Sequence, residues 1–398
     1  MPYPHPVAEG NIPRAIPSLT SRTEENKIDS LETSQGTSAP VADEGATPLK
    51  FTRKIRLDRI GSATSPARLN NIVEVSEDCV ADEGTIVVCR ALGERKVYGE
   101  LELPSGRMAK VVSGNIVAGV LGARQALHGY MGEPPKTLKA GDTLSLLNIG
   151  GVTGVVSSAS KALGMPIPMQ VLGVVVRNGK PVNIRDYALP AAGPLRPDGP
   201  PLLMVLGTCM NSGKTYAATE VIRLMSHNGV RIAAGKLSGV GALKDVLGMG
   251  DNGAIAISSF LECGHPSTVN VKDLAATARS VVTHLEKANP DLIVLELGDG
   301  IIGGYNLGSI LNDKSILART KARILCANDL VGAWGGVNFL TDLGHRPQVV
   351  SGPVTDNAVG TSYIERELKI RSANARNEPV VLTQILADAL NLTVTIKE

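Results

Sequence analysis

The chain has 398 residues, which is too long for one small module and predicts two domains at roughly 150 residues each. Lys and Arg number 40 and Asp and Glu 38, so the formal charge of +2 gives no field that would draw the chain onto nucleic acid or an anionic membrane. With seven Tyr, three Phe and one Trp, aromatic platforms for stacking nucleic-acid bases are not expected either.

The first predicted segment is a disordered tail over residues 1–50. It holds seven of the 24 prolines and shows neither helical nor strand periodicity. It lacks the apolar run of a signal peptide, and no later apolar run reaches the length of a membrane span. The five cysteines are odd in number and have no CxxC spacing, which favours a reducing compartment over a disulfide framework or a zinc site. We therefore expect a cytoplasmic protein without a membrane partner.

A smaller β-rich domain is predicted over residues 51–186. Short β-branched runs alternate there with glycine turns, which is typical of a barrel or sandwich with little helix. The segment 122–135 gathers Arg124, His128 and Tyr130, either as a substrate-specificity surface or, more commonly for such a segment, as a solvated loop. The strand-like runs are TIVVCRAL (85–92), KVYGELEL (96–103), AKVVSGNIVAGVLG (109–122), DTLSLLNIGGVTGVV (142–156) and MQVLGVVVRNGKPVNI (169–184).

A linker and an α/β domain follow. The run YALPAAGPLRPDGPP is rich in Pro and Gly and predicts an extended linker over 187–200. Over 201–398, apolar strand-like runs alternate with amphipathic segments, which predicts a parallel sheet covered on both faces, with ligands at the carboxyl ends of its strands. The expected strands are 202–207, 231–236, 291–297, 322–328 and 347–352, and the expected helices are 213–227, 272–287, 307–319, 330–342, 358–368 and 380–390.

The strongest chemical signal is the run LLMVLGTCMNSGKTYAATEVIRLM, in which an apolar strand leads through a glycine-containing turn into a helix. This pattern predicts a phosphate-binding loop, whose backbone N–H groups cradle oxyanions at the positive end of the helix. Lys214 would place its charge across the β- and γ-phosphates, and Thr215 would offer a hydroxyl to Mg²⁺. The expected nucleotide contacts in this run are Gly207, Thr208, Asn211, Ser212, Gly213, Lys214 and Thr215.

The spacing of this loop departs from the common GxxxxGK[ST] pattern, because Thr208 stands at the first glycine and Gly207 precedes it. A GT pair followed by four residues and GKT resembles the loop of dethiobiotin synthetase and its relatives, which include ATP-dependent carboxylases, amide-forming ligases and metallocenter GTPases. Partitioning and metal-pump ATPases of the same branch carry an extra lysine at the position of Cys209, so their mechanism is not implied. The resemblance covers residues 201–398.

The resemblance also implies roles for residues that follow later strands. Lys236 matches a lysine that faces the transferred phosphoryl group, and Glu296 matches a glutamate that coordinates Mg²⁺. Asp245 or Asp251, in a Gly-rich loop, would complete the metal shell, with Asp245 the better match. Asp299 would be a metal ligand, a general base or a turn residue.

The sequence gives a weaker signal for the residues that would bind the nucleotide base. Asn328 and Asn357 follow predicted strands and would either contact the purine, as in the resembling enzymes, or serve turns and helix caps. The chain has no NKxD quartet, the usual reader of guanine, which favours ATP over GTP.

These observations predict an ATP- and Mg²⁺-dependent ligase or carboxylase-like enzyme that phosphorylates a small carboxylate or carbamate and transfers it to an amine. Lys214 and Lys236 would be the catalytic cations, with Thr215, Asp245 and Glu296 on the metal. Two alternatives stay open: a nucleotide-gated cofactor- or metal-assembly NTPase, and an amino-acid N-acyltransferase whose loop binds the phosphates of coenzyme A. Dimerisation is common in the resembling branch, which implies a homodimer.

Overall fold

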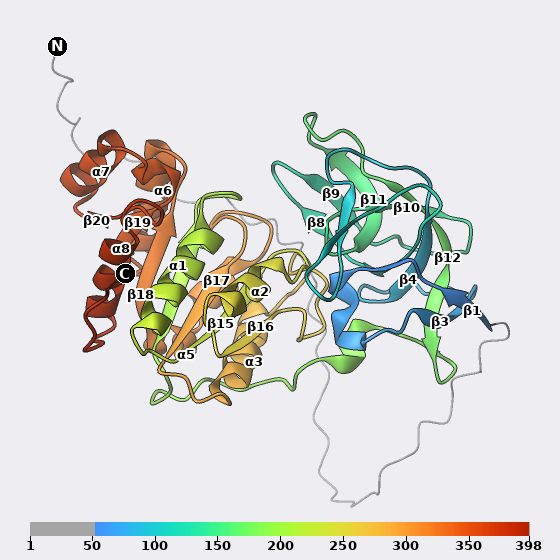
Figure 1. Ribbon diagram of the computed structural model, residues 1–398, viewed down its shortest axis with the longest axis horizontal. Coiled ribbons are helices and arrows are strands. Elements are labelled where there is room, and N and C mark those ends of the chain that lie inside the picture. Colours follow the sequence, from blue (N-terminus) through green and yellow to red (C-terminus); the bar gives the residue numbers. More distant parts are fainter. Residues whose placement is uncertain (1–51, 398) are drawn as a thin grey trace, which may run out of the picture. The chain divides into compact units, whose positions relative to one another are not determined.

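The structure is a computed structural model that describes residues 52–397 (Figure 1). The tail predicted over residues 1–50 lies outside the described residues. All described residues belong to one unit of the chain, Thr47–Glu398. Within it we distinguish a β-rich part, residues 52–187, and an α/β part, residues 202–397; their division into separate domains stays a prediction.

The β-rich part closes a sheet into a barrel. The strand β12 (Pro168–Arg177) pairs with β4 (Ile86–Ala91), β4 with β7 (Ile116–Leu121), β7 with β11 (Val152–Ala159), β11 with β10 (Thr143–Leu146), and β10 again with β12. The β-branched and glycine-punctuated runs suit such a closed, strongly curved sheet. Its interior is filled by buried apolar side chains, among them Val87, Cys89, Val117, Leu144, Leu146, Met169 and Val171.

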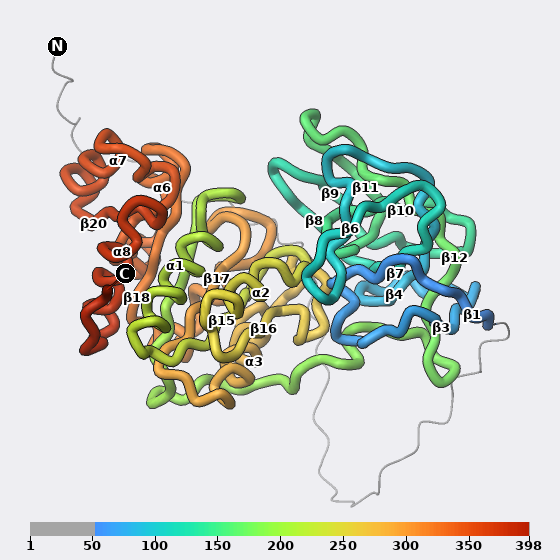
Figure 2. Tube along the Cα trace, in the orientation of Figure 1, coloured from blue at the N-terminus to red at the C-terminus, as the bar shows by residue number. Residues whose placement is uncertain are grey.

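Short elements border the barrel (Figure 2). The strand predicted over 96–103 is reduced to Glu100–Glu102, because Tyr98 adopts a φ of 55° that interrupts an extended chain. The bordering strands are β1 (Thr52–Arg56), β2 (Arg59–Ile60), β3 (Ile72–Ser76), β5 (Glu100–Glu102), β6 (Met108–Lys110), β8 (Arg124–Gln125), β9 (Tyr130–Glu133) and β13 (Lys180–Pro181), with short helical turns η1 (Ser62–Ala67) and η2 (Ile184–Tyr187).

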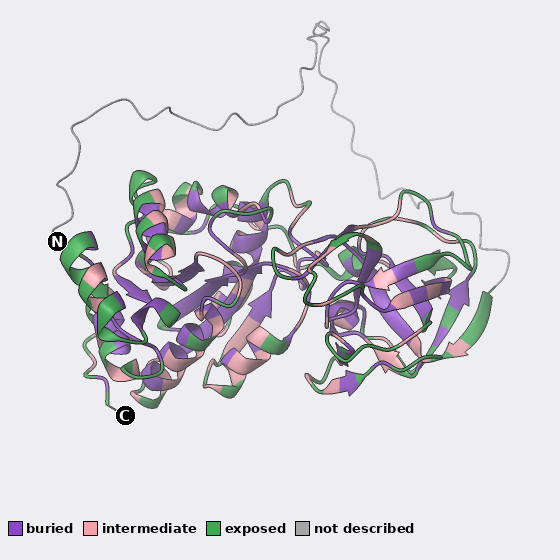
Figure 3. Cartoon of the chain, turned by 90° about the horizontal axis from the view of Figure 1, so that it is seen from above, coloured by how far each residue is buried: buried purple, intermediate pink, exposed green. Residues whose placement is uncertain are grey.

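The α/β part is built on a parallel sheet, with described strands in the order β16–β15–β17–β14–β18–β19–β20. The central strands are buried along their whole length, as Figure 3 shows, because helices cover both faces. The α/β fold with a parallel sheet, preceded by a smaller β-rich part, is thereby confirmed. The strands are β14 (Leu202–Gly207), β15 (Ile232–Ser238), β16 (Ala256–Ser259), β17 (Leu292–Leu297), β18 (Thr320–Cys326), β19 (Val349–Ser351) and β20 (Arg371–Ser372).

Helices pack on the two faces of this sheet in separate apolar clusters. One cluster joins α1, α2 and α8 to alternate residues of the strands, and the other joins α3 to α6 to the opposite face. The helices are α1 (Lys214–His227), α2 (Lys244–Asp251), α3 (Leu274–Glu286), α4 (Leu307–Leu311), α5 (Lys314–Arg319), α6 (Leu330–Asp342), α7 (Ala358–Tyr363) and α8 (Pro379–Ala389), with short turns η3 (Pro353–Thr355) and η4 (Ile364–Leu368).

Two helices differ from the prediction. The single helix expected over 307–319 is divided, because the Asp313 side chain accepts a hydrogen bond from the Ile316 N–H and starts a new helix there. The segment expected to be a Gly-rich loop around Asp245 and Asp251 forms α2 instead. Apolar packing of Val246 and Met249 against the sheet outweighs the low helix propensity of its two glycines.

The predicted linker runs in extended form along the α/β part. The Leu189 N–H donates to the Glu262 carbonyl at 2.7 Å, and the Ala192 N–H donates to Ser280 Oγ at 3.0 Å. Near its end, Arg319 donates to the Pro200 carbonyl and forms an ion pair with Glu286. The linker is therefore fixed to the α/β part at these points, while most of its residues are exposed.

Two further predictions concern membrane-spanning helices and the state of the cysteines. No helix in residues 52–397 is long and apolar enough to cross a membrane. The five cysteines are free thiols, and burial raises the pKa of Cys89, Cys263 and Cys326 to about 12. These three thiols stay protonated at neutral pH, so their role is packing.

Candidate nucleotide site

The predicted phosphate-binding loop lies between β14 and α1. The strand ends at Gly207 and the helix begins at Lys214. Gly213 has a φ of 92°, which glycine adopts without strain, and it turns the chain into the helix. A Cβ on Gly207 would lie 2.4 Å from Ser212 Oγ and 2.8 Å from Lys214 Cδ, so a side chain there would collide with the loop. The shifted first glycine is thus required by close packing of the loop on itself.

Lys214 lies inside the curve of the loop. Its side chain is buried, with 6% of the residue exposed, and Nζ donates to the Cys209 carbonyl at 2.7 Å and to Ser212 Oγ at 3.4 Å. Burial lowers the pKa of Lys214, and the neighbouring Glu296 carboxylate opposes that effect. A cation enclosed by loop backbone is placed to exchange these neutral acceptors for phosphate oxygens.

Glu296 stands near the carboxyl end of β17, beside the start of α1. Its Oε1 accepts a hydrogen bond from Thr215 Oγ1 at 3.0 Å, and Oε2, which is buried, has no hydrogen-bond partner within residues 52–397. Burial raises the pKa of Glu296, and the Lys236 and Lys214 ammonium groups oppose the rise. A buried carboxylate with an unpartnered oxygen, next to a hydroxyl, suits a hard divalent cation.

The described residues contain no group of three or more His, Cys, Asp and Glu side chains suited to a metal ion. A Mg²⁺ ion is commonly held by one or two protein oxygens together with phosphate oxygens and water. Thr215 and Glu296 fit that requirement.

Lys236, on β15, and Asp245, on α2, form a largely buried ion pair. Burial alone would lower the pKa of Lys236, but the Asp245 and Glu296 carboxylates raise it above its ordinary value, and Lys236 in turn holds the pKa of Asp245 down. The structure thus joins Asp245 to Lys236, whereas Asp251 ends α2, is exposed and does not line the cavity that Asp245 lines. Asp245 therefore pairs with Lys236, and its place as a metal ligand stays a prediction.

Asp299 follows β17 in the glycine-rich turn. It adopts a φ of 67°, a strained conformation for a residue with a side chain, and burial raises the pKa of its carboxyl group. It lines the same cavity as the two lysines.

The late asparagines do not gather at this cavity. Asn328 is exposed and its Nδ2 lies 3.1 Å from Cys209 Sγ, and Asn357 caps α7 by accepting from the Val359 N–H at 3.0 Å. In the C-terminal region, Arg366 pairs with Glu367 and Arg371 donates to the Ile385 carbonyl. Asn357 is explained by helix capping, and Asn328 keeps a position beside the loop.

One cavity of about 700 Å³ connects these groups. Its walls combine the loop and strand ends of the α/β part with side chains of the β-rich part. The residues that carry chemistry along it are Lys214, Thr215, Lys236, Asp245, Glu296 and Asp299 from the α/β part and Tyr98, Arg124 and Asn148 from the β-rich part.

The α/β part therefore has a parallel sheet with the predicted phosphate-binding loop between its central strand β14 and helix α1. No family model matches the chain, and no curated protein matches it in sequence. Similar solved structures include the signal recognition particle 54 kDa protein of Aeropyrum pernix K1 in complex with GDP, which is 15% identical with a TM-score of 0.35 over 50% of this chain and 47% of that one. The chain thus spans about half the length of that protein.

The signal recognition particle receptor FtsY of Elizabethkingia anophelis is 15% identical, with a TM-score of 0.36 over 54% of this chain and 75% of the other. The cell division protein FtsY of Thermotoga maritima is 18% identical, with a TM-score of 0.34 over 49% and 71%. At these scores the likenesses carry no argument about activity, which has to be sought in the site itself.

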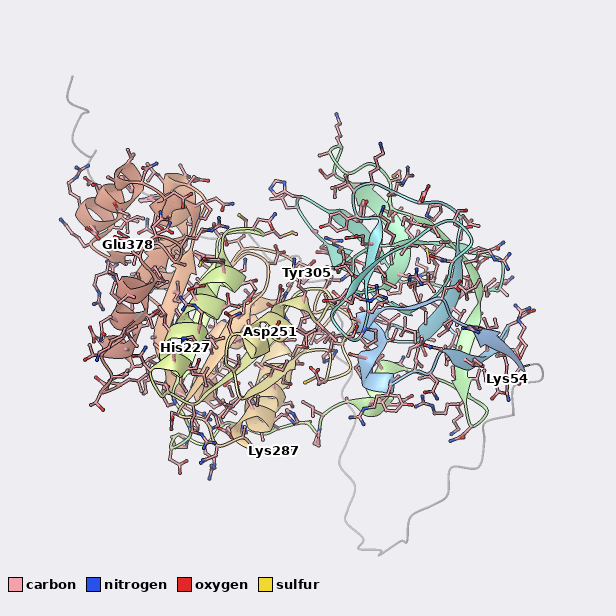
Figure 4. All side chains as sticks on the ribbon, in the orientation of Figure 1. Lys54, His227, Asp251, Lys287, Tyr305 and Glu378 are labelled. Atoms are coloured by element: carbon pink, nitrogen blue, oxygen red, sulfur yellow. The ribbon has the colours of Figure 1, made fainter. Side chains whose placement is uncertain are left out.

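The fold brings several residues to the cavity that no sequence pattern singled out. Tyr98 and Asn148 come from the β-rich part, and Tyr305 accepts a hydrogen bond from the Gln125 N–H at 3.2 Å (Figure 4). Arg376 lies over the ring of Tyr216, 5.0 Å from its centroid. The positions of these residues in the cavity depend on contacts between segments that are distant in sequence. Among the cavity residues of the β-rich part, the sequence had marked only Arg124, through its neighbours His128 and Tyr130.

Proposed function

We propose that the chain is an ATP- and Mg²⁺-dependent ligase or carboxylase-like enzyme, which activates a small carboxylate or carbamate by phosphorylation and transfers it to an amine. The observation that carries this proposal is the shared cavity. It joins the two lysines and the Thr215–Glu296 pair at the loop, and continues to polar side chains of the β-rich part. A nucleotide triphosphate would fill the loop end and leave the other end for a second substrate.

The two lysines have distinct roles in this proposal. Lys214 lies within the loop and would contact the β- and γ-phosphates, while Lys236, on the neighbouring strand end, would face the γ-phosphoryl group as it moves to the acceptor. Asp245 keeps Lys236 protonated and fixes its direction. Fixed cations aimed at the transferring group stabilise the charge of the transition state without rearranging.

Thr215 and Glu296 would hold the metal. Bound Mg²⁺ supplies positive charge to the β- and γ-phosphate oxygens. Glu296 contributes an oxygen that has no other partner in residues 52–397, and Thr215 is oriented toward it by their hydrogen bond.

The proposed reaction has two steps, phosphorylation of the carboxylate and transfer of the acyl group to the amine. A carboxylate oxygen of the substrate attacks the γ-phosphorus of ATP, the bond from that phosphorus to the bridging oxygen breaks, and ADP leaves with the electron pair. The amine nitrogen then attacks the carbonyl carbon of the acyl phosphate. Phosphate leaves with the C–O electron pair and accepts the proton that the amine loses.

The preference for ATP is supported by the region after β18. Asp329, in ANDL, accepts a hydrogen bond from the Gly332 N–H at 2.8 Å and caps α6. One oxygen of that carboxylate is engaged by the helix, and the chain lacks the NKxD quartet that usually reads guanine.

The test is the Mg²⁺-dependent release of ADP and phosphate from ATP by the full chain, with and without fractions of a small-metabolite extract. One fraction should stimulate release in the wild type and yield an amide- or carbamate-containing product. Lys214→Ala should weaken ATP binding about 100-fold or more and abolish turnover, and Lys236→Ala should abolish turnover while nucleotide binding persists. Lys287→Ala, outside the cavity, is the matched control.

Two results would reject the proposal. ATP hydrolysis stimulated by a protein client, with no modified small product, would favour an assembly NTPase. Binding of acetyl-coenzyme A without binding of ATP would favour the acyltransferase.

A further inference from the structure

Arg124 is a buried cation in the cavity wall of the β-rich part. Only 5% of the residue is exposed, and it opens the short strand β8 at the edge of the barrel sheet. Its Nη1 donates to the Leu147 carbonyl, and its Nη2 donates to the Tyr98 hydroxyl at 3.2 Å. The guanidinium carbon lies 5.2 Å from the Tyr98 ring centroid and 5.7 Å from that of Tyr130. The solvated loop expected around Arg124 and Tyr130 is therefore wrong for both residues, since both are buried.

Among the described residues, no acid is in hydrogen-bond contact with Arg124, and the carboxyl group that acts on it electrostatically is that of Asp299, whose pKa, raised by burial, Arg124 works to lower. Its hydrogen bonds go to a carbonyl and a hydroxyl, it forms no ion pair within residues 52–397, and its other N–H groups have no acceptor there. A guanidinium has five N–H donors in a planar fork, so donors remain for a ligand. Burying a cation without an anion in direct contact is costly, and the two aromatic rings offset only part of that cost.

The surroundings hold this guanidinium in place. Tyr98, which contacts it through both ring and hydroxyl, adopts the strained φ of 55°. Tyr130 meets Tyr98 edge to face, with ring centroids 5.4 Å apart. Strained backbone of this kind persists where surrounding structure fixes it, and it is concentrated at binding sites.

Arg124 and the phosphate-binding loop lie on one cavity. Arg124, Asp299 and Tyr305 all line it, and the residue after Arg124, Gln125, donates its N–H to the Tyr305 hydroxyl. Asn148 also lines the cavity, but its side chain is already engaged with the Gly241 carbonyl and the Val152 N–H. Arg124 is thus the cation of the β-rich wall that has donors to spare.

We infer that Arg124 is the binding residue for a second, non-reacting carboxylate of the small-molecule substrate. The substrate class is then a small dicarboxylic acid, or an amino acid with an acidic side chain, in which one acidic group is phosphorylated and the other is held by Arg124. The planar fork of arginine matches a carboxylate, which can accept two N–H groups at once. This inference rests on the proposed function, since it names the substrate class of the same site.

The experiment measures binding as well as turnover. The full chain, loaded with Mg²⁺ and a non-hydrolysable ATP analogue, is titrated with a series of α,ω-dicarboxylates from malonate to pimelate. Each dicarboxylate is compared with the monocarboxylate of the same length. At least one dicarboxylate should bind, and it should bind more tightly than its monocarboxylate partner. Arg124→Gln should weaken that binding roughly 10- to 100-fold, as expected for a hydrogen-bonded charge pair.

A matched control is available in Arg177. It donates to the Tyr187 hydroxyl and to the Ala67 carbonyl and lies 5.5 Å from the Tyr187 ring centroid, so it repeats the contacts of Arg124 away from the cavity. Arg177→Gln should leave dicarboxylate binding unchanged. Arg124→Lys keeps the positive charge and should retain folding while losing the two-pronged contact.

The outcomes separate this inference from the function on which it rests. If ATP binds through Lys214 but no dicarboxylate binds more tightly than its monocarboxylate, or if Arg124→Gln binds it as the wild type does, the inference is overturned and the proposed function stands. Equal losses in Arg124→Gln and Arg177→Gln would show a structural effect and would also overturn it. Failure of the wild type to bind ATP would reject the proposed function itself.

Discussion

At the scale of single residues, the site depends on charges that the surrounding groups hold in place. Glu296 is buried between a hydroxyl and two lysine side chains, and Lys236 is kept charged by Asp245. Each of these groups is costly to bury alone, because its charged form loses contact with water. These groups act through their arrangement, so replacing one of them should reduce the catalytic rate more than the free energy of unfolding.

Replacing Glu296 tests the metal position. Glu296→Gln keeps the size of the side chain and an oxygen for the Thr215 hydroxyl, but removes the negative charge. Mg²⁺-dependent ADP release should fall about 100-fold or more, the scale of losing one fixed electrostatic group, while ATP affinity without Mg²⁺ stays close to that of the wild type. Glu220→Gln, on the same helix as Thr215, is the control. Wild-type Mg²⁺ dependence in Glu296→Gln would refute this role.

His265 predicts a pH dependence of stability. Burial, with a smaller effect of Arg185, lowers the pKa of His265 from 6.5 to about 4. Between these values the unfolded chain binds a proton that the folded chain does not, so the free energy of unfolding should fall as the pH drops from 6.5 toward 4. The loss attributable to His265 should be about 2 to 3 kcal/mol, allowing for partial solvent screening.

Urea unfolding of the wild type, of His265→Gln and of the control His227→Gln between pH 7 and pH 4 checks this. His265→Gln should flatten the slope and His227→Gln should not. An unchanged slope in His265→Gln would show that other groups set the acid sensitivity.

At the scale of elements, local sequence patterns were sufficient to predict the structure wherever strand, loop and helix are consecutive in sequence. The loop from Gly207 to Thr215 and the strand end at Glu296 were predictable because each lies within one apolar run and its following turn. The helix α2 was not, since Gly248 and Gly250 suggest a loop and only packing on the sheet makes them helical. Tyr98 gave no signal in the sequence, and Arg124 was predicted at the site in only one of two alternatives, because their proximity to the loop depends on pairing of distant segments.

Contact between elements is close at Gly150, in the turn between β10 and β11. A Cβ on Gly150 would lie 1.9 Å from the Gly241 carbonyl oxygen, so Gly150→Ala requires a backbone shift. It should lower the free energy of unfolding by about 1 to 3 kcal/mol, the usual cost of overpacking. Gly93→Ala, where no atom lies within 4 Å of the added Cβ, should change it little. Denaturant unfolding of both variants measures the difference, and equal stabilities would contradict the packing argument.

At the scale of the whole molecule, the β-rich part is joined to the α/β part by buried polar contacts at the edge of the cavity. Glu102, fully buried, accepts from the Leu243 N–H at 2.7 Å and from the Ser62 hydroxyl through one oxygen. Asn148 donates to the Gly241 carbonyl at 2.7 Å. These contacts hold the segment before α2, and therefore the partner of Lys236, against the barrel.

Removing the Glu102 carboxylate should leave buried donors without an acceptor. Glu102→Ala should lower the free energy of unfolding by about 1 to 3 kcal/mol and should reduce turnover more than nucleotide binding, because α2 carries Asp245. Glu100→Ala, exposed on the same strand, is the control. Denaturant unfolding and ATP titration measure both effects; a stable, fully active Glu102→Ala variant would contradict the coupling.

The most direct measurement is the equilibrium binding of ATP to the full chain, with and without Mg²⁺, in the wild type and in Lys214→Ala. The nucleotide site proposed here predicts saturable binding at one site, strengthened by Mg²⁺. It also predicts a loss of about 100-fold or more in Lys214→Ala, as expected when a buried charge pair with phosphate is removed. Absence of ATP binding in the wild type, or equal affinity in Lys214→Ala, would contradict it.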